Sequence, residues 1–275
     1  MRYRLLPLLP LAGAAAVVAA AVLGGAGPRL WWTSEVSAQL ASVACCLAAA
    51  AAFGRGDYML RAWTLTALGN LLPALNRLTA GPDASWWLAR IAGRPWLDLA
   101  LSTLVNGFSI AGALYFVGAF WRSGLSLPGS RGRQAAVIGG AIGVALLLGA
   151  PVLYFSVQDV LGGGLAEGIP EAIGILGDVV AFSLVAPLFR IALEFRGGVL
   201  QWPWGLLAAS NLGWLTYDVV ALVSRRAGSA GPARLACEVV VVMTYLCAGA
   251  AGLAHRWAIS GSGEARSAAP APSAG

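Results

Sequence analysis

The feature of this sequence that most limits its fold is a series of eight apolar stretches, each long enough to cross a lipid bilayer. A helix needs about 20 predominantly apolar residues to cross about 30 Å of hydrocarbon. Within that layer each backbone polar group must find its hydrogen bond inside the protein, which favours helices. We therefore predict an all-α fold, a polytopic membrane bundle of about eight transmembrane helices, near residues 5–25, 36–53, 61–80, 97–120, 135–156, 170–193, 202–223 and 235–256.

The composition supports a protein that resides in a bilayer. Hydrophobic residues make up 59% of the chain and charged residues 11%, against about 45–50% and 25% in soluble domains. The first stretch follows "MRYR", as in a signal peptide, but its apolar core exceeds the usual length of about 7–15 residues. We therefore expect it to remain as a membrane helix.

The net charge of +6 comes entirely from arginines, since the chain has no lysine. These arginines stand singly or in pairs at the ends of apolar stretches, so we predict membrane flanks and no nucleic-acid partner. More of them fall on the cytoplasmic side if both termini are cytoplasmic. The expected location is a bacterial inner membrane, crossed several times, with both termini in the cytoplasm. The absence of lysine also excludes a Schiff base with retinal or pyridoxal phosphate.

A repeated motif divides the chain into two halves. Residues 63–76 read "WTLTALGNLLPALN" and residues 204–218 read "WGLLAASNLGWLTYD", which share W-x-L-x-A-x-x-N-L. The same alignment places acids at equivalent positions, Glu35 with Asp178 and Asp98 with Glu238. We predict two parallel four-helix repeats, residues 1–133 and 134–259. A Gly, Ser, Ala and Pro-rich tail, residues 260–275, is expected to be disordered and cytoplasmic.

The motif places a tryptophan and an asparagine two helical turns apart on one face. We expect Trp63 and Trp204 near the cytoplasmic interface, where aromatic residues anchor membrane helices. Asn70 and Asn211 then lie near the bilayer centre, where an amide needs a partner, most simply on another helix. Two interpretations remain open, an interhelical contact and a ligand site.

Small residues predict where helices approach closely. Gly139 and Gly143 form a GxxxG motif, and Ala248 and Gly252 repeat its spacing. Such spacing is typical of packed membrane helices. It indicates contact between helices and does not indicate a catalytic role.

Acids inside the apolar stretches are the strongest functional pointers, because a charge at that depth is costly. Asp178 lies well inside its stretch and Asp218 lies in the outer third of its own, while Glu35, Asp98 and Glu238 lie nearer the outer ends. Ion pairs with arginines at helix ends are the alternative interpretation of these acids. The candidate ligand-binding residues are Asp178, Asp218, Glu238, Asn70, Asn211, Tyr217 and Trp214.

The sequence indicates no catalytic residue, metal site or cofactor. His255 is the only histidine, and we expect it at the inner membrane interface rather than as a general base. The four cysteines lack the C-x-x-C spacing of a zinc site and are expected to be buried apolar side chains. They are Cys45, Cys46, Cys237 and Cys247.

Four segments resemble the multi-helix membrane input modules of bacterial signalling proteins, over about residues 30–256. They are "RAWTLTALGNLLPALNRL" (61–78), "LGDVVAFSLVAPLFRIAL" (176–193), "LLAASNLGWLTYDVV" (206–220) and "LACEVVVVMTYLCAGAAGLAH" (235–255). In such modules an acid opens one span and another closes the next, and Asp178 and Asp218 occupy matching places.

The resemblance implies a non-enzymatic sensory module that binds a small extracytoplasmic ligand. No output domain follows the last apolar stretch, so we expect a cytoplasmic signalling partner beside the lipid bilayer. A secondary transporter of a small molecule or proton is the alternative hypothesis. An intramembrane enzyme acting on lipid or isoprenoid is a third, with Cys45 or Cys46 and His255 as its only thiol–imidazole option.

Overall fold

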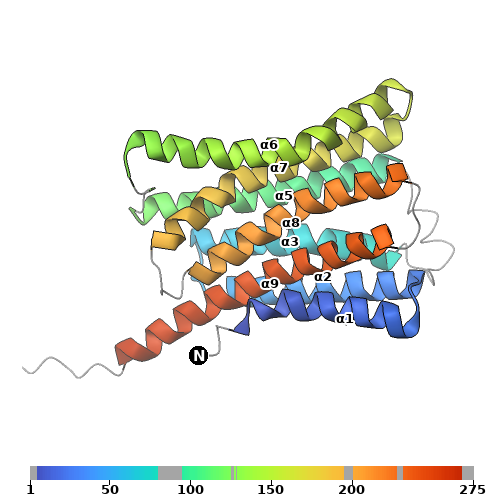
Figure 1. Ribbon diagram of the computed structural model, residues 1–275. Helices are drawn as coiled ribbons and strands as arrows, with labels where there is room; N and C mark the ends of the chain where they lie inside the picture. Colours follow the sequence, from blue (N-terminus) through green and yellow to red (C-terminus); the bar gives the residue numbers. More distant parts are fainter. Residues whose placement is uncertain are drawn as a thin grey trace, which may run out of the picture.

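The computed structural model describes residues 5–79, 95–124, 127, 129–194, 201–227 and 232–267. These residues form eight helices joined by turns, and the described part of the chain contains no strand (Figure 1). The all-α prediction is therefore confirmed. The helices are α1 (Leu8–Gly24), α2 (Pro28–Ala50), α3 (Tyr58–Thr79), α5 (Pro95–Arg122), α6 (Arg131–Leu161), α7 (Leu165–Glu194), α8 (Gln201–Ala227) and α9 (Pro232–Ser267).

Six of these helices are long and apolar enough to cross a bilayer, namely α2, α5, α6, α7, α8 and α9. The chain is therefore a multi-pass helical membrane protein. Each of the eight predicted stretches overlaps one helix, but α1 has only 17 residues and α3 is less apolar than the six. Two polar residues of α3, Thr66 and Asn70, face the interior of the bundle, as described below.

Six helices pack in a closed ring, in the order α2, α3, α5, α7, α8, α9 and back to α2. The remaining two are peripheral. α1 lies outside the ring against α9, and α6 lies outside it against α7 and α8 (Figure 1). The ring interior is therefore enclosed by helices from both ends of the sequence.

The ring closes where α2 meets α9, and glycines allow this close approach. A Cβ atom on Gly252 would lie 3.0 Å from the carbonyl oxygen of Cys45, and one on Gly249 would lie 3.1 Å from Cα of Ser42. The predicted helix contact at Gly252 is confirmed. Any larger side chain at these two positions would push the two helices apart.

The predicted contact at Gly139 and Gly143 is wrong. A Cβ atom at either position would meet nothing within 4 Å. The reason is that α6 is peripheral, and these glycines lie on a part of it that no neighbouring helix covers. The glycine of α6 that does face a neighbour is Gly149, where a Cβ atom would lie 2.7 Å from Val179 of α7.

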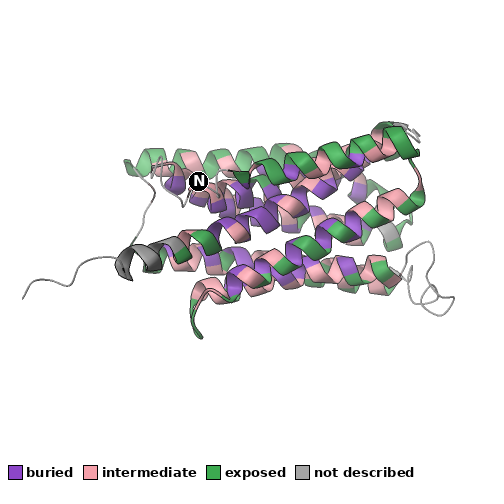
Figure 2. Cartoon of the chain, turned by 90° about the horizontal axis from the view of Figure 1, so that it is seen from below, coloured by how far each residue is buried: buried purple, intermediate pink, exposed green. Residues whose placement is uncertain are grey.

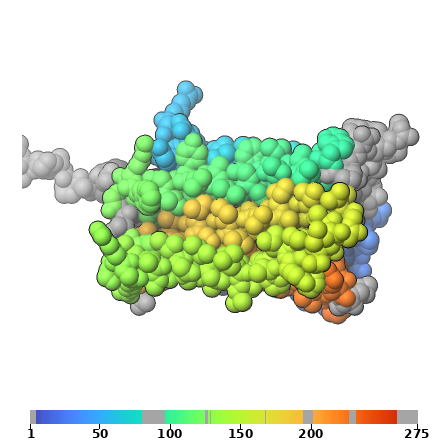
Figure 3. Space-filling model, turned by 90° about the horizontal axis from the view of Figure 1, so that it is seen from above, coloured from blue at the N-terminus to red at the C-terminus, as the bar shows by residue number. Residues whose placement is uncertain are grey.

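Burial follows the ring. Buried residues gather on the inward faces of the helices (Figure 2). The exposed large side chains of α6 include Ile142, Leu146 and Leu147, which are apolar. Seen from the side of α6, α7 lies in a furrow between α5 and α6 (Figure 3), and a groove of about 680 Å³ runs there. Its lining is mostly apolar, including Val117, Ile138 and Leu184. Such a surface suits contact with lipid chains.

The predicted tail falls partly outside the described residues, and one connection between helices falls wholly outside them. α9 runs on to Ser267, past the predicted start of the tail at residue 260, and residues 268–275 are outside the described part. The connection between α3 and α5 is also outside it, with Trp86, Trp87, Arg90 and Arg94.

Candidate functional site

The interior of the ring contains a polar cavity. Its wide part has a volume of about 280 Å³, and a narrow part of about 40 Å³ continues from it. Four residues, Asn70, Ser109, Asp178 and Trp214, line both parts. The cavity is lined by α3, α5, α7, α8 and α9, so five of the six ring helices contribute to it.

Six of the seven candidate residues line this cavity. Asp178, Asn70 and Trp214 line both parts, Tyr217 and Asp218 line the wide part, and Asn211 lines the narrow part. They come from α3, α7 and α8, which are far apart in the sequence. The helical ring therefore gathers residues that the sequence analysis selected separately. Whether they bind a ligand stays a prediction.

Asp178 and Asp218 form a carboxyl pair at the centre of the site. The two carboxyl groups line the same part of the cavity and lie close enough to interact. Among the described residues neither has an arginine as an ion-pair partner, and Oδ2 of Asp218 is buried without any hydrogen bond. Two neighbouring carboxyl groups in surroundings of low dielectric do not both ionise, so the pair carries at most one negative charge.

Aromatic side chains form the wall beside the carboxyl pair. The ring of Trp214 lies 5.0 Å from that of Tyr245 and 6.0 Å from that of Tyr217, both in edge-on arrangements. The hydroxyl of Tyr245 accepts a hydrogen bond of 3.2 Å from Nε2 of Gln39 on α2. The wall is therefore held from behind by the sixth helix of the ring.

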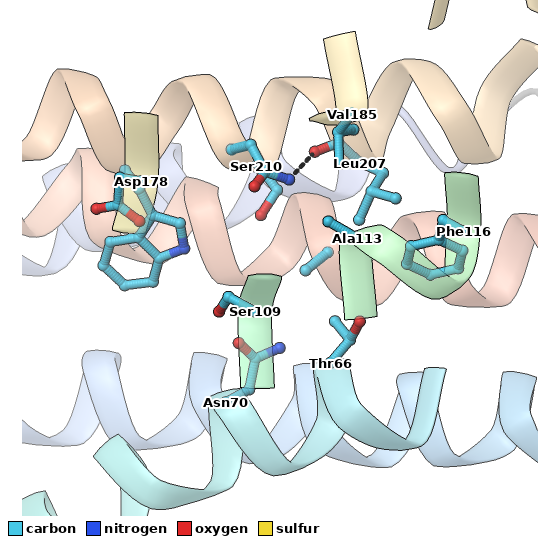
Figure 4. Close-up of a pocket in the computed structure, with 12 residues that line it drawn as sticks. Thr66, Asn70, Ser109, Ala113, Phe116, Asp178, Val185, Leu207 and Ser210 are labelled. Carbon is cyan, nitrogen blue, oxygen red and sulfur yellow. Dashed lines mark hydrogen bonds between the residues drawn. The ribbon is translucent and has the colours of Figure 1, made fainter. Parts of the chain in front are cut away.

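The two repeated asparagines behave differently. Nδ2 of Asn70 donates to Oγ of Ser42 on α2 at 2.9 Å, so the predicted partner on another helix is confirmed there. Nδ2 of Asn211 donates instead to the carbonyl oxygen of Leu207, one turn back in its own helix, at 2.9 Å (Figure 4). The expectation of an interhelical partner for Asn211 is wrong, because the backbone of its own helix offers a nearer acceptor.

The other acids form ion pairs near the helix ends, as the alternative interpretation expected. Glu35 pairs with Arg77 at 2.7 Å, and Glu238 pairs with Arg234 one turn away at 2.5 Å. Glu238 does not line the cavity, although its Oε2 is buried and has no partner. Further pairs join Arg225 to Glu171 and Arg226 to Asp159.

The opposite end of the ring interior is closed by an aromatic cluster, which we define as Trp63, Phe116, Trp204 and His255. The ring of Phe116 lies 4.9 Å from Trp63 and 5.4 Å from Trp204. His255 lies 5.8 Å and 5.6 Å from the same two rings. Nε1 of Trp63 donates to Nδ1 of His255 at 3.0 Å. Since Phe116 also lines the narrow part of the cavity (Figure 4), the cluster lies at the end of that part.

This cluster overturns three predictions. Trp63 is 0% exposed and Trp204 is 3% exposed, so neither is an interfacial anchor. His255 is 5% exposed, so its side chain is enclosed by the bundle and does not face headgroups. All three residues lie on inward faces of ring helices, where packing between helices replaces contact with headgroups.

Several cavity residues were missed by the sequence analysis. Ser109, Ser210 and Thr66 line the narrow part, and Asn106 lines the wide part. Short hydroxyl side chains in apolar helices often bond to their own backbone, as Thr66 does to Ala62, so they carry little signal. The position of Thr66 could have been predicted, since it lies one turn before Asn70 on the same helix face.

The nucleophilic and metal-binding residue types are scattered. Cys46, Cys237 and Cys247 are buried as predicted, while Cys45 is half-buried. Within the described ranges, no group of three or more His, Cys, Asp or Glu side chains lies close enough to hold a metal ion. The chemistry that the site offers is hydrogen bonding, negative charge and aromatic surface.

Fold and site together define a multi-pass helical membrane protein with a polar cavity inside a ring of six helices. Comparison with protein-family models, with curated proteins and with solved structures finds no match. The function is therefore argued from the cavity itself.

Proposed function

We propose that this chain is a non-enzymatic, ligand-binding sensory protein of a bacterial inner membrane. The observation that carries the proposal is the convergence of six polar or aromatic candidates on one cavity, with a buried carboxylate oxygen left unpartnered. Buried polar groups without partners are costly and cluster at functional sites. The cavity volume of about 280 Å³ suits a ligand at or below the small end of known binding pockets.

A ligand in this cavity would contact both halves of the chain. The wide part is lined by α3 and α5 from the first half and by α7, α8 and α9 from the second. Binding would therefore change how the two halves pack against each other. The aromatic cluster also joins the two halves, since Trp63 and Phe116 contact Trp204 and His255. A change in packing would reach the far end of the ring through it, where a partner would detect it.

The order of helices in the ring supports the proposed pair of parallel repeats. α2, α3 and α5 follow one another around it, and α7, α8 and α9 then follow in the same sense. The repeated residues Trp63 and Trp204 both pack on Phe116 and His255. Those two lie on α5 and α9, which the repeat makes equivalent. The peripheral helices break the pattern, because α1 lies mainly against α9 whereas α6 lies against α7 and α8.

We assign the aromatic end of the ring to the cytoplasm and the ion-paired end to the outside. The arginine distribution supports this orientation. The ligand would then enter from outside, past the rim formed by pairs such as Arg77–Glu35, and the partner would be cytoplasmic.

The test is cross-linked affinity purification from native membranes, with partners quantified by mass spectrometry. We expect wild-type protein to recover a kinase, cyclase or transcription regulator in near-equal amount. Asp178→Asn should change the yield of that cross-link. The matched control is Asp159→Asn, which removes an exposed acid of the rim and should leave the yield unchanged. Recovery of the chain alone from wild-type membranes would contradict the sensory proposal.

A secondary transporter is the second candidate, favoured by one observation. The cavity is closed at one end by aromatic side chains that both halves contribute, so that a shift between the halves could open that end. This arrangement suits alternating access between two repeats. It predicts flux of substrate or protons in proteoliposomes that contain only this chain. Flux that Asp178→Asn abolishes and Asp159→Asn preserves would favour transport over sensing.

A further inference from the structure

Among the described residues that line the cavity, no cation faces the carboxyl pair. Asp178 and Asp218 are the only acids in this lining, and no arginine or histidine is part of it. The nearby guanidinium groups are engaged at the rim, as Arg77 is with Glu35 and Arg234 with Glu238. A buried charge is normally paired, so the occupant of the cavity would supply the positive charge.

The unpartnered atoms point to a donor of hydrogen bonds. Among the described residues, the buried side-chain nitrogen and oxygen atoms without a partner are Gln39 Oε1, Asp218 Oδ2 and Glu238 Oε2. All three are oxygens that accept hydrogen bonds. Asp218 also lines the cavity, so its free oxygen would take an N–H from the occupant.

The aromatic wall favours an organic cation. Trp214, Tyr217 and Tyr245 stand beside the carboxyl pair, and the faces of such rings attract ammonium groups. A bare metal ion would fill little of a cavity of about 280 Å³, since even a water molecule takes up only about 30 Å³ in the liquid. The remaining space suits a short apolar substituent.

We infer that the cavity binds a small organic monocation that carries N–H donors, with its ammonium group between the carboxyl pair and the aromatic wall. The inference rests on the proposed ligand-binding function and names the class of ligand. Because the two neighbouring carboxyl groups carry at most one negative charge, a single positive charge balances them. The amide and hydroxyl groups of Asn70, Asn106 and Ser109 then orient the ligand.

The test is isothermal titration calorimetry on the full chain in lipid nanodiscs at neutral pH. Two series of probes are used, and within each series the apolar group stays the same while the charge of the polar group changes. They are benzylammonium, benzyl alcohol and benzoate, and n-butylammonium, n-butanol and butyrate. We expect one or both ammonium probes to bind at least about tenfold more tightly than their neutral and anionic counterparts.

Variants localise the effect. Asp218→Asn should weaken binding of the ammonium probe by at least about tenfold, while Asp159→Asn at the exposed rim should leave it unchanged. The charge series in wild-type protein decides the inference even if Asp218→Asn does not fold.

Three results would overturn the inference. They are equal binding of an alcohol or carboxylate probe, ammonium binding that Asp218→Asn leaves intact, and no ammonium binding at all. Tight binding of a neutral or anionic probe would support a ligand-binding cavity but reject its preference for cations. Failure of the cross-linking experiment, by contrast, would reject the sensory function and would not affect the calorimetric result.

Discussion

The two ends of the ring interior are built from opposite kinds of chemistry. At the aromatic end, Trp63, Trp204 and Phe116 are packed edge to face, and the one polar contact joins Trp63 to His255. At the other end, the half-buried Asp178 and Asp218 line the cavity, and Oδ2 of Asp218 is buried without a hydrogen-bond partner.

This difference indicates which end of the ring stabilises the fold and which end lowers its stability. Close packing and satisfied hydrogen bonds stabilise membrane bundles. Buried carboxyl groups do not, and proteins retain such groups chiefly at functional sites. The comparison makes a general claim, that changes at the aromatic end cost stability and changes at the carboxyl pair cost binding. Four predictions follow it, ordered by their expected effect on stability.

The largest effect is expected from Trp63→Ala. Trp63 is 0% exposed and contacts both Phe116 and His255. Its truncation should lower the free energy of unfolding by about 3–5 kcal/mol, because a large side chain leaves a cavity in a packed site. The measurement is unfolding in detergent, followed by fluorescence-detected size exclusion. Trp121→Ala is the matched control, since Trp121 is 79% exposed, and it should change stability by less than about 0.5 kcal/mol. Equal losses of unfolding free energy in the two variants would show that the aromatic end is not a stabilising core.

The second prediction separates packing from hydrogen bonding at the same end. His255→Phe keeps an aromatic ring against Trp63 but removes the acceptor of its Nε1–H group. An unpartnered buried donor should cost about 1–3 kcal/mol, whereas replacing both partners by apolar groups should cost less. We therefore expect the double variant Trp63→Phe/His255→Phe to be more stable than His255→Phe in the same unfolding assay. A double variant that is less stable would show that ring packing outweighs the hydrogen bond.

The third prediction concerns the contact that holds α2 to α3 behind the cavity. Asn70 donates to Ser42 at 2.9 Å, and Asn70→Ala and Ser42→Ala each remove that bond. A double-mutant cycle should give an interaction energy of about 0.5–1 kcal/mol, the usual size for such bonds between membrane helices. An interaction energy near zero would mean that Asn70 serves the cavity alone.

Much of the fold could be predicted from apolar length, because a span through hydrocarbon has to be helical. The carboxyl site was also partly predictable. Asp178 and Asp218 stand out against apolar neighbours, and a costly group inside a membrane segment demands an explanation. The motif pairing Trp63 with Trp204 identified equivalent helices, although it did not indicate which way these helices face.

The rest depends on how helices pack, which the apolar pattern does not encode. In a soluble helix, hydrophobic periodicity separates the inward face from the outward face, but lipid makes both faces apolar. Trp63 inside and Trp121 outside therefore look alike in the sequence. For the same reason the motif at Gly143 resembled that at Gly252, although only the second one meets a neighbouring helix.

The smallest change in stability is expected from Asp178→Asn, and this prediction tests the comparison most sharply. An asparagine keeps the size of the side chain and can still hydrogen-bond to Asp218, while it removes a group whose burial is costly. The free energy of unfolding should stay within about 0.5 kcal/mol of wild type or increase. Asp218→Asn, which removes the unpartnered acceptor Oδ2, should likewise keep its stability, but it should lose binding of benzylammonium. Because Trp63→Ala is expected to be unstable at any probe concentration, the carboxyl variants should separate cleanly from it in paired unfolding and calorimetry. A loss of stability in Asp178→Asn as large as that in Trp63→Ala would mean that the carboxyl pair supports the fold, and the distinction between the two ends would be lost.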